Sequence, residues 1–122
     1  MQSGENIKLN EKIKRPWGYY TIIAQGTGFQ TKIIHVNPHQ KLSVQSHNHR
    51  SEHWFVLSGC AKVLLNKDYY NLNIGQSIDI PIKEIHSLQN EYDKDLEVLE
   101  VQMGEILSEE DITRYEDIYG RV

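Results

Sequence analysis

The stretch that decides the fold of this 122-residue chain is QSHNHRSEHWFVLSG, residues 45–59. Three histidines, a glutamate, a glutamine and an arginine stand here beside the apolar run WFVL. Alternate side chains of an extended strand share one face. If residues 42–49 are extended, their apolar side chains need a buried side, and the opposite face lines the lumen of a small barrel. That inner face would carry Ser43, Gln45, His47 and His49, a polar row that predicts a metal or ligand site.

Short runs rich in Val, Ile, Tyr and Trp continue on both sides of this stretch, separated by turn signals such as QGTG and NPHQ. No helical crossover stands between them. The pattern predicts an all-β fold, an antiparallel sandwich or barrel. The expected strands are 18–24, 29–36, 42–47, 52–58, 60–65, 69–72, 77–80, 85–89 and 95–103.

The two ends of the chain depart from the strand pattern. Residues 1–14 are polar, and we expect a loose arm there before a single domain formed by residues 15–122. In the tail, SEEDITRYEDIYG offers Ser108 as a helix N-cap and Gly120 as a stop. The sequence therefore predicts one short C-terminal helix, with helical spacing between Ile112, Tyr115 and Ile118.

Composition excludes several classes of function. With 13 basic and 17 acidic residues the net charge is −4, so no basic excess favours nucleic-acid binding. No stretch approaches the ~20 apolar residues of a membrane span, and the N-terminus has no apolar run typical of a signal peptide. The lone Cys60 cannot form an internal disulfide, which suits a reducing compartment. We expect a cytoplasmic domain.

The spacing of the polar residues resembles the two motifs of the cupin family, G-x5-H-x-H-x3,4-E-x6-G and G-x5-P-x-G-x2-H-x3-N. The second motif runs from Gly75 through Pro81 and His86 to Asn90, with Lys83 where the motif has its middle glycine. Counting back from Gly59, the first motif falls on Glu52, His47 and Gln45. His39 takes the place of its first glycine.

This resemblance implies a cupin fold, a double-stranded β-helix or jelly-roll barrel, around one divalent metal ion. Two imidazoles and two oxygen donors make a site of intermediate hardness that accepts several metals. We expect Zn first, with Co, Mn, Fe, Ni or Mg as alternatives. The implied ligands are Gln45, His47, Glu52 and His86.

Three longer blocks are similar to a narrower family. RPWG at 15–18, LSVQSHNHRSEHW at 42–54 and EVQMGEILSEEDITRYEDIYGR at 100–121 resemble the isomerase domain of type II phosphomannose isomerases. In that family the domain usually follows a mannose-1-phosphate guanylyltransferase domain. This sequence contains no counterpart of that domain, so we expect a stand-alone isomerase domain. The resemblance implies metal-dependent interconversion of mannose 6-phosphate and fructose 6-phosphate, with Lys32, Arg50 and Arg114 at the substrate.

Moving a proton between the C1 and C2 atoms of a sugar requires a base, an electrophile and a phosphate anchor. Arg50 or Lys32 would bind phosphate or stabilise developing charge. For the base, His49 shares the predicted inner face and has a suitable ordinary pKa, and Glu84 near the second motif is the other candidate.

Plainer interpretations stay open beside these. Arg50 could form a structural ion pair, and Arg114 could form an ion pair on the surface. Lys32 could be a solvated charge at the rim of the pocket. The rival functions are another metal-dependent cupin enzyme on a sugar phosphate or sugar nucleotide, such as an epimerase or ketoisomerase, and a non-catalytic sugar-phosphate-binding cupin. A homodimer is expected in either case, with no nucleic acid or membrane as partner.

Overall fold

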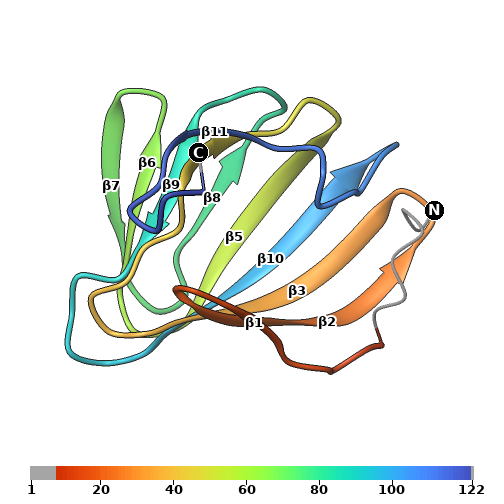
Figure 1. Ribbon diagram of the computed structural model, residues 1–122. Coiled ribbons are helices and arrows are strands. Elements are labelled where there is room, and N and C mark those ends of the chain that lie inside the picture. The colour runs from red at the N-terminus through yellow and green to blue at the C-terminus, as the bar shows by residue number, and fades with distance from the viewer. Residues whose placement is uncertain (1–7, 122) are drawn as a thin grey trace.

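The computed structural model describes residues 8–121 as eleven strands in two antiparallel sheets, without a helix in that range (Figure 1). The first sheet has the order β1 (Ile13–Arg15), β2 (Gly18–Gly26), β3 (Phe29–Val36), β10 (Leu96–Gly104), β5 (Arg50–Ser58) and β8 (Ser77–Ile80). The second has the order β11 (Thr113–Glu116), β4 (Val44–Ser46), β9 (His86–Gln89), β6 (Ala61–Leu65) and β7 (Asp68–Leu72).

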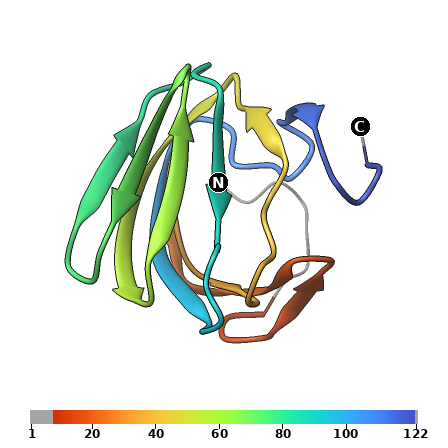
Figure 2. The same ribbon diagram turned by 90° about the vertical axis from the view of Figure 1, so that its left-hand side faces the viewer.

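The two sheets curve around a common interior, which Figure 2 shows nearly end-on. Each of the nine expected strands overlaps an observed one, so the all-β prediction is confirmed. The interior is built by alternation: along β10, Leu96 and Val98 are fully buried and their neighbours Glu97 and Leu99 are not. Burying a side chain of this size contributes about 1.5–3 kcal/mol. This apolar core stabilises the two sheets whose strands carry the residues of the polar pocket described below.

Several turns at the glycine positions of the two cupin motifs have a left-handed backbone. Gly59 has φ +85°, and a Cβ there would lie 2.6 Å from the carbonyl oxygen of Asp95, so the turn requires glycine. His39 and Lys83, which replace motif glycines, also adopt positive φ values of 62° and 70°. They keep the left-handed backbone of a glycine at a cost in conformational energy.

The motif asparagine, Asn90, joins three segments of the chain. Its buried amide nitrogen donates to the carbonyl oxygens of Val36 at 3.1 Å and Lys94 at 2.7 Å, and to that of Asn37 at 3.3 Å. These bonds tie the β9–β10 turn to the end of β3. The residue is structural, at a distance from the polar pocket.

The C-terminal helix prediction was wrong. Residues 113–116 form β11, which pairs with β4 and places Arg114 opposite Gln45. The chain leaving β10 crosses to the second sheet to reach this position (Figure 1). Tyr115 and Ile118, whose spacing suggested a helix, are 50% and 56% exposed. Hydrogen bonding to an open strand edge outweighs the local helical spacing.

Part of the expected N-terminal arm lies within the described residues and pairs with the first sheet. β1 begins at Ile13, inside the expected arm, and pairs with β2. The backbone nitrogen of Asn10 donates to the carbonyl oxygen of Ile22 at 2.8 Å, which extends this contact. The first seven residues of the arm lie outside the described range. Within that range, no helix is long and apolar enough to cross a membrane.

Candidate functional site

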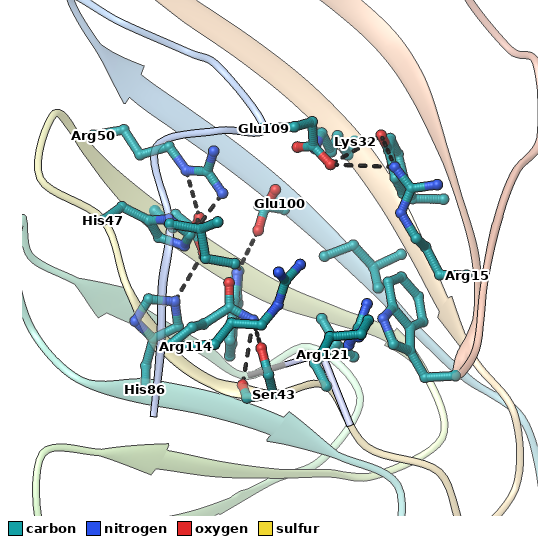
Figure 3. Close-up of a pocket in the computed structure, with 18 residues that line it drawn as sticks. Arg15, Lys32, Ser43, His47, Arg50, His86, Glu100, Glu109, Arg114 and Arg121 are labelled. Carbon is teal, nitrogen blue, oxygen red and sulfur yellow. Dashed lines mark hydrogen bonds and ion pairs between the residues drawn. The ribbon is translucent and has the colours of Figure 1, made fainter. Parts of the chain in front are cut away.

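Three of the four expected metal ligands meet at one point inside the barrel. His47 follows β4, Glu52 lies on β5 and His86 begins β9. All three are buried, and their ligand atoms lie within 4.8 Å of one another. Glu52 joins the two rings: its Oε2 is 3.3 Å from His47 Nε2 and its Oε1 is 3.7 Å from His86 Nε2. Figure 3 shows His47 and His86 on one side of a pocket.

Both imidazoles are oriented by backbone carbonyls. His47 Nδ1 donates to the carbonyl oxygen of Asp111 at 2.6 Å, and His86 Nδ1 donates to that of Glu84 at 2.8 Å. Each ring therefore turns its Nε2 toward Glu52. Among the described residues, no hydrogen-bond partner reaches His86 Nε2, although this atom is buried. A buried imidazole nitrogen held in this way fits a metal ligand.

Gln45 is placed to complete the donor set. It lines the same pocket and lies opposite His86 in the pairing of β4 with β9. Its amide nitrogen donates to the carbonyl oxygen and the hydroxyl of Ser43, at 3.2 Å and 3.1 Å. The amide oxygen is therefore the atom that Gln45 can offer to a cation. Its role as fourth ligand stays a prediction.

Arg50 dominates the electrostatics of this group. Its Nε donates to Glu52 Oε2 at 2.8 Å, and its Nη2 donates to His47 Nε2 at 3.2 Å. Burial and the Arg50 charge lower the pKa of His47 to about 3, so the ring is neutral at ordinary pH. Burial alone would raise the pKa of Glu52, but the charge of Arg50 lowers it overall. Neutral imidazoles and an ionised carboxylate are the forms that bind metals.

Glu100, on β10, is a pocket residue that the sequence analysis missed. Its carboxylate accepts from Trp54 Nε1 at 3.0 Å and from Gln102 Nε2 at 2.7 Å. It also lies in hydrogen-bonding contact with Glu52. Burial, followed by the Glu52 charge, raises the pKa of Glu100 to about 7. The available signal was alternation: Glu100 shares the inward face of Leu96 and Val98, where an unpaired acid is costly.

A second charged cluster lies across the pocket from the histidines (Figure 3). Lys32 Nζ is 3.0 Å from Glu109 Oε2, and Arg15 Nη2 is 3.5 Å from Glu109 Oε1. Burial would raise the pKa of Glu109, but Lys32 and the arginines lower it to about 2. Glu109 and Arg15 were not singled out from the sequence, because their contact joins residues 94 positions apart.

The remaining expected site residues divide into two groups. Arg114 lines the pocket, and its Nε is buried without a hydrogen-bond partner in the described part of the chain. His49 is exposed and lies outside the pocket lining, because the chain bends at 48–49 instead of continuing β4. Its placement on the inner face was wrong. Glu84 offers its carbonyl to His86 and does not line the pocket.

The two facing sheets and the buried His–Glu–His group define the class of this protein as a cupin. The fold is similar to that of a solved Klebsiella pneumoniae protein with a double-stranded β-helix domain, at a TM-score of 0.70 and 16% identity, over 88% of this chain and 87% of the other. At this identity the likeness concerns the fold alone.

The family is shown by closer relatives. Residues 2–117 match the family described as mannose-6-phosphate isomerase C-terminal, and the chain belongs to it. It is 46% identical over 110 residues to the alginate biosynthesis protein AlgA of Pseudomonas putida, which is 90% of this chain and 23% of AlgA. It is 43% identical over 114 residues to the mannose-1-phosphate guanylyltransferase ManC of Salmonella typhimurium, covering 93% and 24% respectively. The chain spans about a quarter of the length of these relatives.

Proposed function

We propose that this chain is a metal-dependent aldose–ketose isomerase that interconverts mannose 6-phosphate and fructose 6-phosphate, in the supply of sugars for polysaccharide synthesis. The observation that carries the proposal is the division of one pocket into two ends. The donors His47, Glu52 and His86 converge at one end, and the cations Lys32 and Arg15 lie at the other. A phosphorylated sugar has hydroxyl and carbonyl oxygens at one end and an anion at the other.

The donor set fits a divalent metal, since His86 Nε2 is buried without a hydrogen-bond partner among the described residues and both rings are oriented by their Nδ1 atoms. Gln45, His47, Glu52 and His86 would hold the ion. When bound, it would polarise the C1 and C2 oxygens of the sugar as a Lewis acid. Arg50, beside Glu52, would stabilise the negative charge that develops on those oxygens.

We assign the proton transfer between C1 and C2 to Glu100. Three carboxylates line the pocket, as far as its lining is described. Glu52 belongs to the donor set, and Glu109 is bound by Lys32 and Arg15. Glu100 is left as the carboxylate that faces the pocket without an ion pair closer than 4.0 Å in the described structure. This replaces His49 and Glu84 as the candidate base.

One observation favours a second candidate, a cupin that binds a sugar phosphate without catalysis. The Arg50 guanidinium contacts both Glu52 and His47, at 2.8 Å and 3.2 Å, and so uses two of the lone pairs that a metal would need. In this alternative, Arg50 takes the electrostatic role of the ion. The two candidates differ in whether purified protein retains a stoichiometric metal.

The experiment is a coupled isomerase assay on mannose 6-phosphate, after chelation and after addition of Zn, Co, Mn, Fe, Ni or Mg. We expect turnover that metal restores and that His47→Ala abolishes. The matched control is His53→Ala, since His53 is a histidine of β5 whose ring contacts Asp79 and which lies outside the lining of this pocket. If no metal restores turnover although metal binds, the isomerase assignment fails. If metal does not bind either, the binding-protein candidate is favoured.

The expected homodimer and cytoplasmic location stay predictions. The exposed apolar side chains of the first sheet include Phe55 and Met103, at 36% and 57% exposure, and a second copy could cover them. Light scattering on the purified chain measures the oligomeric state directly. A monomeric mass at micromolar concentration would contradict the dimer.

A further inference from the structure

Lys32 is a cation held in an unusually buried place. Its side chain, on β3, is only 6% exposed. Its Nζ lies 4.1 Å from the centre of the Tyr20 ring and 3.0 Å from Glu109 Oε2. A buried ammonium is expensive unless an anion accompanies it, so an anionic partner stabilises Lys32 at this position.

The partner comes from a different part of the chain. Glu109 lies in the connection between β10 and β11, while Arg15, Tyr20 and Lys32, which contact its carboxylate, lie on the first three strands. Lys32 Nζ contacts one carboxylate oxygen, and the other oxygen is reached by the Tyr20 hydroxyl at 3.2 Å and by Arg15 Nη2 at 3.5 Å. Two cations and a hydroxyl around one anion form the kind of recognition that phosphate receives in proteins.

Glu109 is also placed so that it can leave. Its side chain is 34% exposed, in contrast to the Lys32 side chain. Two residues later the chain is anchored by Asp111, whose buried carboxylate accepts from the backbone nitrogens of Asn48 and His49 at 2.9 Å and 3.0 Å. A swing of the Glu109 side chain would therefore leave the support of His47 in place.

We propose that Arg15, Tyr20 and Lys32 form the subsite for the phosphate group of the ligand, and that the Glu109 carboxylate occupies this subsite until phosphate displaces it. The inference rests on the proposed function and adds the position of the anion. Displacement keeps Lys32 paired throughout. It also means that Glu109 competes with the phosphate group and lowers the affinity of the pocket for phosphorylated ligands.

The test measures binding of inorganic phosphate and of mannose 6-phosphate by calorimetry, at fixed ionic strength and with chelator present. Glu109→Gln removes the competing charge and should lower both dissociation constants about tenfold, equivalent to about 1.4 kcal/mol. The matched control is Glu110→Gln, which removes the same charge from the exposed neighbour and should change neither constant more than about twofold.

The opposite change is expected on the cationic side. Lys32→Met and Arg15→Met should each raise the dissociation constants about tenfold. Because Lys32 is buried and its replacement could impair folding, Arg15→Met at the half-exposed rim provides an independent result. The proposal is overturned if Glu109→Gln binds phosphate no more tightly than Glu110→Gln does, or if folded Arg15→Met binds it as tightly as the unmodified chain.

The readout separates this inference from the isomerase assignment, since it needs neither metal nor turnover. If the chain is inactive in the isomerase assay but shows this pattern of phosphate binding, the phosphate subsite is supported and the isomerase assignment is not. If the chain is active but its affinity for phosphate does not change when Glu109 or Arg15 is replaced, the isomerase assignment is supported and the phosphate subsite is not.

Discussion

Arg50 and Glu52 stand two residues apart on β5, and their side chains meet on its buried face, with Arg50 Nε 2.8 Å from Glu52 Oε2. The same guanidinium reaches His47 Nε2 at 3.2 Å. A fixed positive charge is thus held against two of the atoms expected to bind a metal. The arginine keeps the carboxylate ionised, and it also opposes the entry of a second cation.

Arg50→Met should therefore bind Zn more tightly and turn over more slowly. Removing a positive charge next to the ion should lower the dissociation constant about tenfold, since like charges at this distance repel by at least 1 kcal/mol. Turnover should fall at least tenfold, because the group that stabilises charge on the sugar is lost. Competition with a chromogenic chelator measures the first, and the isomerase assay the second. Lys62→Met is the control, since that ammonium pairs with Glu91 and lies outside the pocket lining. Weaker Zn binding in Arg50→Met would show that orienting Glu52 matters more than repulsion.

Glu100→Gln should abolish turnover while the metal affinity stays within about threefold. The amide keeps an oxygen for the Trp54 donor but cannot accept a proton, and loss of a general base costs about 10²–10⁴ in rate. Steady-state kinetics and the chelator competition give both quantities. The matched control is Glu97→Gln, on the same strand with a side chain 40% exposed. Turnover retained within tenfold in Glu100→Gln would remove this residue as the base.

The sequence predicted the strands well because each is marked by local alternation. Along β5, alternation puts Glu52, Trp54 and Val56 on one face, and all three are buried. Gln45, His47, Glu52 and His86, which the motif spacing groups together, all line one pocket, and their role as metal ligands stays a prediction. In contrast, β11 was mistaken for a helix because its partner β4 lies about 70 residues earlier, and spacing within 108–120 carries no information about that edge.

The charged cluster of Arg15, Lys32 and Glu109 could not be predicted from the sequence either. Lys32 was expected near the substrate, but its partner Glu109 lies 77 residues away in a segment that looked like a solvated acidic helix. Ser108, expected as a helix cap, does accept a bond from the backbone nitrogen of Glu110, at 3.1 Å. The capping signal was correct, but it begins a single turn here. Local signals of this kind predict a turn, but they do not predict which distant residues the turn contacts.

Acid should weaken the chain partly through Glu109. The pKa of this carboxyl is lowered from its ordinary value of 4.5 to about 2, so its ion pairs stabilise the folded state above pH 4.5 and are lost as the pH falls toward 2. Because the side chain is 34% exposed, solvent screening limits the contribution to about 1 kcal/mol. Urea unfolding at pH 6 and pH 3 should give a loss of stability that is about 0.5 kcal/mol smaller in Glu109→Gln, because a carboxyl with a pKa of about 2 is still largely ionised at pH 3. An equal loss in Glu110→Gln and Glu109→Gln would contradict this assignment.

Lys83→Gly should stabilise the fold. Lys83 has φ +70° at a motif glycine position, and its backbone nitrogen donates to the carbonyl oxygen of His47 at 2.8 Å, so the turn cannot relax without disturbing the site. The left-handed conformation costs a residue with a Cβ about 1–2 kcal/mol, whereas the extra freedom of glycine in the unfolded chain costs about 0.5–1 kcal/mol. The expected gain is about 0.5–1 kcal/mol in urea unfolding, with metal affinity unchanged because the side chain is exposed and outside the pocket lining.

The control for this change is Lys67→Gly. Lys67 is an exposed residue of the β6–β7 turn whose φ is not positive, so only the entropic cost applies and stability should fall by about 0.5–1 kcal/mol. Opposite signs for the two variants would establish that backbone conformation decides the outcome. If Lys83→Gly lost as much stability as Lys67→Gly, the lysine would make a compensating contribution in the turn, and the left-handed backbone would not be its main cost.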